Sequence, residues 1–140
     1  MVQLTNYELI NILKENSRIS FKELARIFGV TDTAIRKRLK RLEVEGIIKK
    51  YTIEIDMKKL GYNVHALIGL DVKPERLFGV IEVLKNMSEV SNLYSTSGDH
   101  MIMIECWFEN SNKLSEYIKK LNDLEGVTRV CPTIILEKLK

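Results

Sequence analysis

Apolar residues recur at helical spacing in three stretches of the first 45 residues, and a helix-capping residue precedes each stretch. Thr5 with Glu8, and Ser20 with Glu23, form the Ser/Thr-x-x-Glu pattern of a capping box, and Thr31 is a third capping residue. The pattern therefore predicts three helices. Their apolar positions are Leu9, Ile10, Ile12 and Leu13, then Leu24, Ala25 and Phe28, then Ile35, Leu39 and Leu42.

Only three residues, 29–31, separate the second predicted helix from the third. Gly29 can adopt the left-handed conformation that ends a helix, and Thr31 can cap the next one. Two helices joined by such a short turn are typical of a helix-turn-helix, whose second helix enters the major groove of DNA. The spacing therefore predicts a DNA-binding motif.

The third predicted helix is strongly basic. Five cations fall within six residues: Arg36, Lys37, Arg38, Lys40 and Arg41. A solvated charged face is the alternative for any helix rich in Lys and Arg, but such a face usually mixes both signs. Here no acid is interleaved with the five cations, and Glu43 and Glu45 follow them at the C-terminal end. This separation of charge favours DNA binding.

Residues that favour β-structure follow Gly46 in partial alternation: Ile47, Ile48, Tyr51, Ile53 and Ile55. We interpret them as the small β-element of a wing, which completes a winged helix-turn-helix domain over residues 1–56. Lys49 and Lys50 then lie where a wing approaches the phosphate backbone. Gly61 and Asn63 interrupt the pattern, and residues 57–63 are predicted to form a hinge.

Residues 64–140 show a different order of periodicities. Alternating or continuous apolar runs predict strands over residues 64–72, 90–95, 101–108 and 127–139. Helical spacing predicts one helix that starts at Pro74 and another over residues 112–124. The order βαββαβ predicts a ferredoxin-like sheet with both helices on one face, and an α+β fold for the whole chain. Pro132 cannot donate to a central ladder, so the last strand is predicted at an edge.

The predicted strand 101–108 is apolar on both faces. Ile102, Ile104, Cys106 and Phe108 lie on one side, and Met101, Met103 and Trp107 lie on the other, with Glu105. The helices can cover only one face. A larger core within the chain is the alternative, but too few residues remain for a third layer, so we expect a homodimer that covers the second face.

Charge is divided unevenly along the 140 residues. Residues 1–60 hold 13 Lys and Arg against 8 Asp and Glu, net +5, and residues 61–140 hold 9 against 11, net −2, which gives the overall +3. The basic half is the half with the helix-turn-helix, as expected of a DNA-binding protein.

Several classes are disfavoured. The N-terminus lacks the apolar core of a signal peptide, and the apolar runs are too short to cross a bilayer, so we expect a cytoplasmic protein that does not contact membranes. Cys106 and Cys131 lack CxxC spacing and are predicted to be free thiols in a reduced protein. No nucleophile–base pair, metal-ligand spacing or phosphate-binding glycine loop appears. We expect neither an enzyme nor a cofactor or metal site.

These features together resemble the Lrp/AsnC (feast/famine) family of prokaryotic transcription regulators over nearly the full chain. The resemblance rests on SFKELARIFGVTDTAIRKRLKRLEVEGIIKKYTIEID, on the following Leu60, Gly61 and Tyr62, and on the six-element second domain. It implies an N-terminal DNA-binding domain and a C-terminal domain that forms dimers and often octamers. It also implies, for many members, an amino-acid site near subunit interfaces.

The effector loop of that family usually resembles TGxYD. The matching stretch here is Ser97, Gly98, Asp99 and His100, followed by Met101 at the acidic position. A thioether cannot form the charge-assisted bond that a carboxylate makes with an amino group. Amino-acid sensing, a different ligand and no small ligand therefore all stay open, and His100 is either a ligand contact or a histidine of the loop or an interface.

The expected DNA contacts fall into two classes. Phosphates are assigned to Lys22, Lys40, Arg41, Lys49 and Lys50, and bases to Asp32, Thr33, Arg36 and Lys37. Arg36 is the strongest choice because Arg can donate two hydrogen bonds to guanine O6 and N7. Arg38 lies nearer the apolar stripe and either packs or contacts a phosphate. A dimer predicts a roughly palindromic operator with half-sites about 10 bp apart, or a multiple of that.

Two other functions compete with an operator-binding regulator. In one, the second domain is a small-molecule binding module and the N-terminal part is a tether. In the other, the chain is an architectural protein that wraps DNA without an operator.

Overall fold

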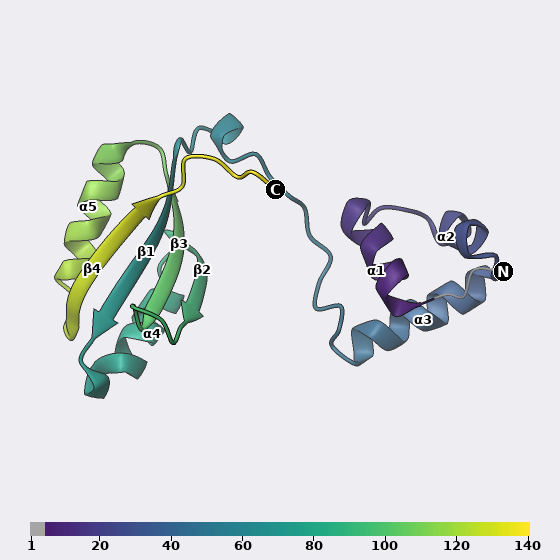
Figure 1. The fold of residues 1–140 in the computed structure, drawn as a ribbon, viewed down its shortest axis with the longest axis horizontal. Coiled ribbons are helices and arrows are strands. Elements are labelled where there is room, and N and C mark those ends of the chain that lie inside the picture. The colour runs from purple at the N-terminus through teal and green to yellow at the C-terminus, as the bar shows by residue number, and fades with distance from the viewer. Residues whose placement is uncertain (1–4) are drawn as a thin grey trace. The chain divides into compact units, whose positions relative to one another are not determined.

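A computed structural model describes residues 5–140 and divides the chain into two compact units between Glu54 and Ile55. The N-terminal unit contains three helices, α1 (Asn6–Glu15), α2 (Phe21–Phe28) and α3 (Asp32–Val44) (Figure 1). The three predicted helices are therefore confirmed, and the division between the units falls two residues before the end expected for the first domain.

Side-chain caps start all three helices. Thr5, Ser20 and Thr31 each accept a hydrogen bond from a backbone N–H of the first turn, at 3.1–3.2 Å. The second half of the predicted capping box at Ser20 is not formed, because the Glu23 carboxylate accepts from Arg26 Nε at 3.0 Å instead. Gly29 ends α2 with φ +63, in the left-handed region expected there.

The core of the N-terminal unit comes from the predicted apolar stripes. Its buried residues are Leu9, Leu24, Ala25, Phe28, Ile35, Leu39 and Leu42. Three of these, spaced along α3, turn one side of that helix toward α1 and α2. The opposite side of α3, which carries most of the cations, therefore faces outward.

The prediction of a β-element in the wing is wrong for the single chain. Among the described residues, 47–56 belong to no strand, and Tyr51, Ile53 and Ile55 are exposed. A strand needs a partner for its backbone N–H and C=O groups, and the N-terminal unit as described contains only helices. The β-forming side chains alone therefore do not create a ladder.

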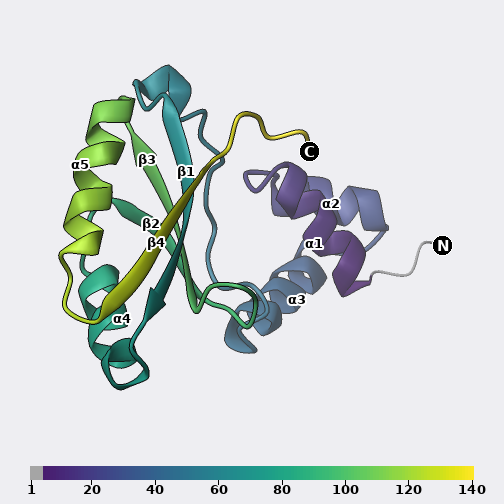
Figure 2. The same cartoon turned by 60° about the vertical axis from the view of Figure 1, so that its left-hand side comes forward.

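The C-terminal unit is a four-stranded antiparallel sheet with two helices. Its elements are η1 (Lys58–Leu60), β1 (Val64–Val72), η2 (Pro74–Arg76), α4 (Leu77–Lys85), β2 (Val90–Ser95), β3 (Ile102–Phe108), α5 (Ser111–Asn122) and β4 (Val127–Ile134). The strands lie in the order β2-β3-β1-β4. Both helices cover the same face of the sheet (Figure 2). This is the predicted βαββαβ arrangement.

The strand β4 lies at an edge, as Pro132 predicted. Pro132 is paired with Ile68, and the ladder ends where the Ile135 N–H donates to His65 O at 2.9 Å. The prediction that this strand reaches residue 139 is wrong. Its neighbour β1 begins at Val64, so the residues after Ile135 have almost no strand left to pair with.

The two faces of the sheet differ in burial. Ala66, Ile68 and Leu70 of β1 are completely buried beneath α4 and α5, together with Ile102, Ile104 and Cys106 of β3. Both cysteines are free, and burial raises the pKa of the Cys106 thiol to about 12. The outer face carries Leu67 of β1 and Met103, Glu105 and Trp107 of β3, all half-buried.

Candidate nucleic-acid interface and ligand loop

The outward side of α3 presents side chains that can contact DNA. Asp32 and Thr33 lie in its first turn, and Arg36, Lys37 and Lys40 follow on its exposed surface. All five side chains are exposed, whereas Ile35 and Leu39 between them are buried. The predicted base-contacting residues therefore share one accessible surface with Lys40.

The guanidinium of Arg36 lies over the ring of Phe21, with Cζ 4.4 Å from the ring centroid. Phe21 is the first residue of α2, so this contact joins the two helices of the helix-turn-helix. The geometry is that of a cation–π interaction. Sequence reasoning did not find this contact, because residues 15 positions apart on different helices share no periodic signal.

Two other arginines of α3 are engaged within the chain. Arg38 is half-buried and donates from Nη1 to Asn6 Oδ1 of α1 at 2.9 Å. Arg41 donates from Nε to Glu45 Oε1 at 2.8 Å, and this partner raises the pKa of Arg41. The basic helix is therefore not uniform: Arg36 and Lys37 point to solvent more freely than Arg38.

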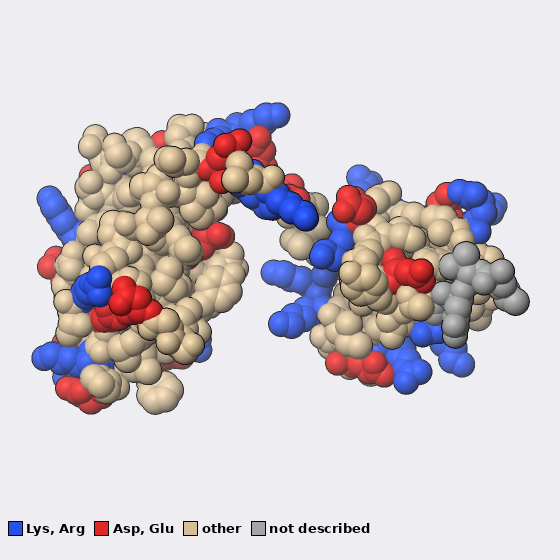
Figure 3. Space-filling model, viewed as in Figure 1, with Lys and Arg blue, Asp and Glu red and all other residues tan. Residues whose placement is uncertain are grey.

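The remaining predicted phosphate contacts lie outside α3. Lys22 is exposed on the first turn of α2, and Lys49 and Lys50 are exposed on the extended segment after α3. In Figure 3, Lys and Arg side chains project from the N-terminal unit on several sides, with fewer acidic side chains among them. The excess of Lys and Arg over Asp and Glu in the first part of the sequence therefore lies on the surface of the N-terminal unit.

A hydrogen bond holds the start of this extended segment near α3. The Tyr51 hydroxyl donates to Glu43 Oε1 at 2.9 Å, and burial, followed by the Glu43 hydrogen bond and charge, raises the pKa of Tyr51. The Ile47 and Ile48 N–H groups both donate to Leu42 O. These hydrogen bonds fix the direction in which the segment with Lys49 and Lys50 extends from the end of α3, although no strand forms.

The predicted ligand loop of the C-terminal unit lies between β2 and β3. Ser97, Gly98 and Asp99 are exposed, and His100 is half-buried. His100 Nδ1 lies 3.2 Å from Asp71 Oδ2 of β1, and the Met101 N–H donates to Asp71 Oδ1 at 3.2 Å. Asp71, which sequence reasoning missed, anchors the loop to the sheet.

Gly69 of β1 makes room for the His100 ring. A Cβ at position 69 would lie only 2.3 Å from His100 Cδ2. Arg129 of β4 completes the cluster, with Nη1 3.7 Å from Asp71 Oδ2 and 3.8 Å from Asp99 Oδ2. Both carboxylates of the cluster therefore already face the guanidinium of Arg129.

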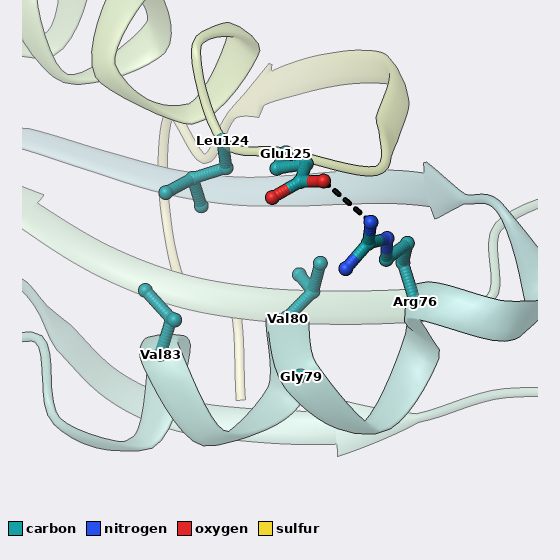
Figure 4. Close-up of a pocket in the computed structure, with 6 residues that line it drawn as sticks. All are labelled: Arg76, Gly79, Val80, Val83, Leu124 and Glu125. Carbon is teal, nitrogen blue, oxygen red and sulfur yellow. Dashed lines mark ion pairs between the residues drawn. The ribbon is translucent and has the colours of Figure 1, made fainter.

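A shallow pocket lies elsewhere in this unit, between α4 and the loop before β4. Gly79, Val80 and Val83 of α4 line it, together with Leu124, and an Arg76–Glu125 ion pair closes one end (Figure 4). None of the sequence-predicted site residues lines it.

Residues 5–140 contain no group of three or more His, Cys, Asp or Glu side chains placed to hold a metal ion. No helix in this same range is long and apolar enough to cross a membrane.

Two family models match the chain. Residues 4–49 match a winged helix-turn-helix DNA-binding model, and residues 65–140 match the Lrp/AsnC ligand binding domain. One match lies within each of the two compact units. They identify the basic helical unit as a DNA-binding domain and the sheet unit as a ligand-binding domain.

Similar proteins have the same architecture. The HTH-type transcriptional regulator LrpA of Pyrococcus abyssi is 47% identical over 141 residues, which covers all of both chains. The structure of E. coli AsnC superposes with a TM-score of 0.88 at 25% identity, over 99% of this chain and 95% of that one. A feast or famine regulatory protein from M. tuberculosis, complexed with L-methionine, has a TM-score of 0.82 at 23% identity, over 94% and 90%.

The relatives are named as transcription regulators and not as enzymes, in agreement with the sequence expectation. The chain joins a winged helix-turn-helix to an Lrp/AsnC ligand binding domain, and E. coli AsnC superposes on it over nearly the full length of both chains. It therefore belongs to the Lrp/AsnC family of DNA-binding transcription regulators.

Proposed function

We propose that this regulator binds a roughly palindromic DNA operator by placing α3 of each of two copies in the major groove. The observation that supports this most directly is the division of α3 into two sides. Its apolar stripe is buried against α1 and α2, while Arg36, Lys37 and Lys40 are exposed. A helix held in this way can enter a groove without losing its own core contacts.

Base recognition is assigned to the N-terminal half of α3. Arg36 is the proposed principal contact, to guanine, with Asp32, Thr33 and Lys37 beside it. Lys22, Lys40, Arg41, Lys49 and Lys50 are proposed to bind phosphates, which orient the protein and make binding depend on salt. Arg38 is proposed to act mainly by holding α1 against α3, because its guanidinium binds Asn6.

Dimerisation is proposed to occur through the outer face of the sheet. Leu67, Met103 and Trp107 lie there half-buried, and Tyr94 of β2 is exposed beside them. An exposed patch of this composition is typical of an interface. Two copies related by a two-fold axis would favour half-sites about 10 bp apart, or a multiple of that, and further association could produce an octamer.

An amino acid is the proposed effector class, and the loop at Ser97, Gly98, Asp99 and His100 is the proposed site. The domain model and the L-methionine complex of the M. tuberculosis protein support this class. The contacts of Asp71 and Asp99 within the chain count against a simple amino-group site, since a ligand would have to compete with the Arg129 guanidinium and with the His100 ring, which lies within hydrogen-bond distance of Asp71. A different small ligand is the alternative.

The domain roles proposed here are the ones predicted from the sequence. Residues 1–56 are proposed to bind DNA, residues 57–63 to act as a hinge and residues 64–140 to assemble the protein and bind the effector. A protein that binds the chromosome of a prokaryote is proposed to work in the cytoplasm.

Selection of bound duplexes from random DNA tests this proposal. The expected result is an enriched, roughly palindromic motif, whose recovery changes when the selection is repeated with a panel of amino acids. Equal recovery of all sequences would instead support the architectural reading. An enriched motif whose recovery no amino acid changes would support the proposed operator and contradict the proposal that an amino acid is the effector.

A further inference from the structure

We infer that Phe21 is a positioning residue for base recognition: its ring holds the Arg36 guanidinium ready to donate to a base. The inference rests on the proposed role of Arg36. It adds a residue that carries no charge, lies on the other helix of the motif and is not among the expected DNA contacts.

The ring of Phe21 has a fixed position. Phe21 directly follows the capping residue Ser20, whose hydroxyl accepts the Glu23 N–H at 3.1 Å. The side chain is half-buried and packs against the core of the N-terminal unit. One side of the ring is thus anchored by the core, and the Arg36 guanidinium lies over its face at 4.4 Å.

The contact with Phe21 leaves the hydrogen-bonding capacity of Arg36 available. A phenyl ring carries no oxygen or nitrogen acceptor, so it pairs with none of the five N–H donors of the guanidinium in a conventional hydrogen bond. The other arginines of this unit with described partners differ in this respect. Arg26, Arg38 and Arg41 direct donors to Glu23, Asn6 and Glu45, respectively.

The same contact restricts a long, flexible side chain before DNA arrives. An arginine that is already oriented loses less conformational freedom on binding than one that samples many rotamers. Because the benefit is realised only where the guanidinium meets its matching base, Phe21 should affect the preference for the operator more than binding to DNA in general.

The test compares two substitutions in the full-length protein. Phe21→Leu removes the ring and keeps an apolar side chain, whereas Phe21→Tyr keeps the aromatic face. The measured quantity is the ratio of affinities for the selected operator and for a random duplex of equal length. We expect Phe21→Leu to lower this ratio roughly 2- to 5-fold, and Phe21→Tyr to leave it close to that of the parent protein.

The melting temperature of each variant shows whether the domain remains folded. Phe21→Met, an unbranched side chain of similar size, is the second variant without a ring if Phe21→Leu lowers the melting temperature strongly. An equal loss for Phe21→Leu and Phe21→Tyr, or an unchanged ratio for both Phe21→Leu and Phe21→Met, would overturn the inference.

A double-mutant cycle shows whether Phe21 acts through Arg36. In an Arg36→Ala background, Phe21→Leu should no longer change the affinity ratio. If Phe21→Leu lowers the ratio as much in this background as in the parent protein, Phe21 does not act through Arg36. The positioning role of Phe21 then fails, while the base-reading role of Arg36 stands. If Arg36→Ala itself leaves the ratio unchanged, the base-reading role proposed for Arg36 fails, and the inference fails with it.

Discussion

Arg36 and Arg38 lie two residues apart on α3 and have different environments. The guanidinium of Arg36 rests on an aromatic face at the exposed surface, while that of Arg38 is half-buried and bound to Asn6. Since an i, i+2 pair lies on different sides of a helix, one basic cluster in the sequence separates into groups with different roles.

Arg36→Ala should weaken binding to the selected operator by about 1–3 kcal/mol and relax the preference for one base pair of each half-site. The reason is the loss of a bidentate donor to guanine. Competition binding against operators altered at single base pairs measures both effects. Arg41→Ala is the matched control, because a phosphate contact should weaken matched and mismatched DNA alike.

Lys49→Ala should weaken binding to all duplexes by a similar factor and reduce the slope of log K against log[salt] by about one unit. Lys49 lies on the extended segment after α3, where its exposed ammonium is proposed to meet a phosphate. Affinity measured over a series of salt concentrations gives the slope. A loss restricted to the operator, with the slope unchanged, would assign Lys49 to base recognition instead.

Gly69→Ala should destabilise the C-terminal unit by about 1–3 kcal/mol, because the new methyl group would overlap the His100 ring. Gly79→Ala is a suitable control, since its Cβ would meet nothing within 4 Å and alanine favours a helix by about 0.5–1 kcal/mol. Chemical denaturation measures both changes. Equal stability of the two variants would show that His100 does not occupy this space in solution.

At the scale of the elements, Ser20 illustrates how a single side chain determines where a helix begins. Ser20→Ala should lower the free energy of unfolding by about 1 kcal/mol, because the Glu23 N–H loses its acceptor. Thermal or urea unfolding of the protein measures the loss. Ser17 is exposed in the turn before α2 and provides the control. The free energy of unfolding of Ser17→Ala should stay within about 0.5 kcal/mol of that of the parent protein.

Local signals were sufficient to predict most elements. Ser20 and Thr31 predicted where two helices begin, the apolar stripe of α3 predicted its buried side, and Pro132 predicted an edge strand. Each of these signals acts within a few residues of the chain. The βαββαβ order then determined the face on which both helices pack.

The errors and omissions have a common physical origin. Residues 47–56 have the composition of a strand, but a strand also needs a partner, which composition cannot supply. The contacts of His100 with Asp71, and of Arg36 with Phe21, join residues far apart in the sequence. Neither contact produces a periodic pattern, so each appears only when the fold brings the elements together.

At the scale of the whole molecule, the excess of positive charge and the proposed dimerisation surface lie on different units. The basic unit carries the proposed DNA contacts, and the sheet unit carries the outer face proposed for dimerisation, where Leu67, Met103 and Trp107 lie beside Glu105. This separation allows assembly to be tested without altering the DNA-binding residues.

Met103→Lys should shift the protein from dimer to monomer, because it places a charge in the middle of the outer face of the sheet. Sedimentation over a range of concentrations measures the shift. Phe78→Lys is the control: Phe78 lies on α4, on the other side of the sheet, and its side chain is 82% exposed. A monomeric parent protein would contradict the proposed dimer, and dissociation by Phe78→Lys alone would place the interface elsewhere.

The edge proline has a consequence for how copies of this protein can aggregate. Ile135, three residues after Pro132, donates to His65 of β1. Because bonded and non-bonded pairs alternate in an antiparallel ladder, Pro132 and Ile68 form a non-bonded pair, and the nitrogen of Pro132 points away from β1. An incoming strand therefore finds a ring where it needs a donor. Fibre-like extension of the sheet by addition of strands is thus obstructed at β4.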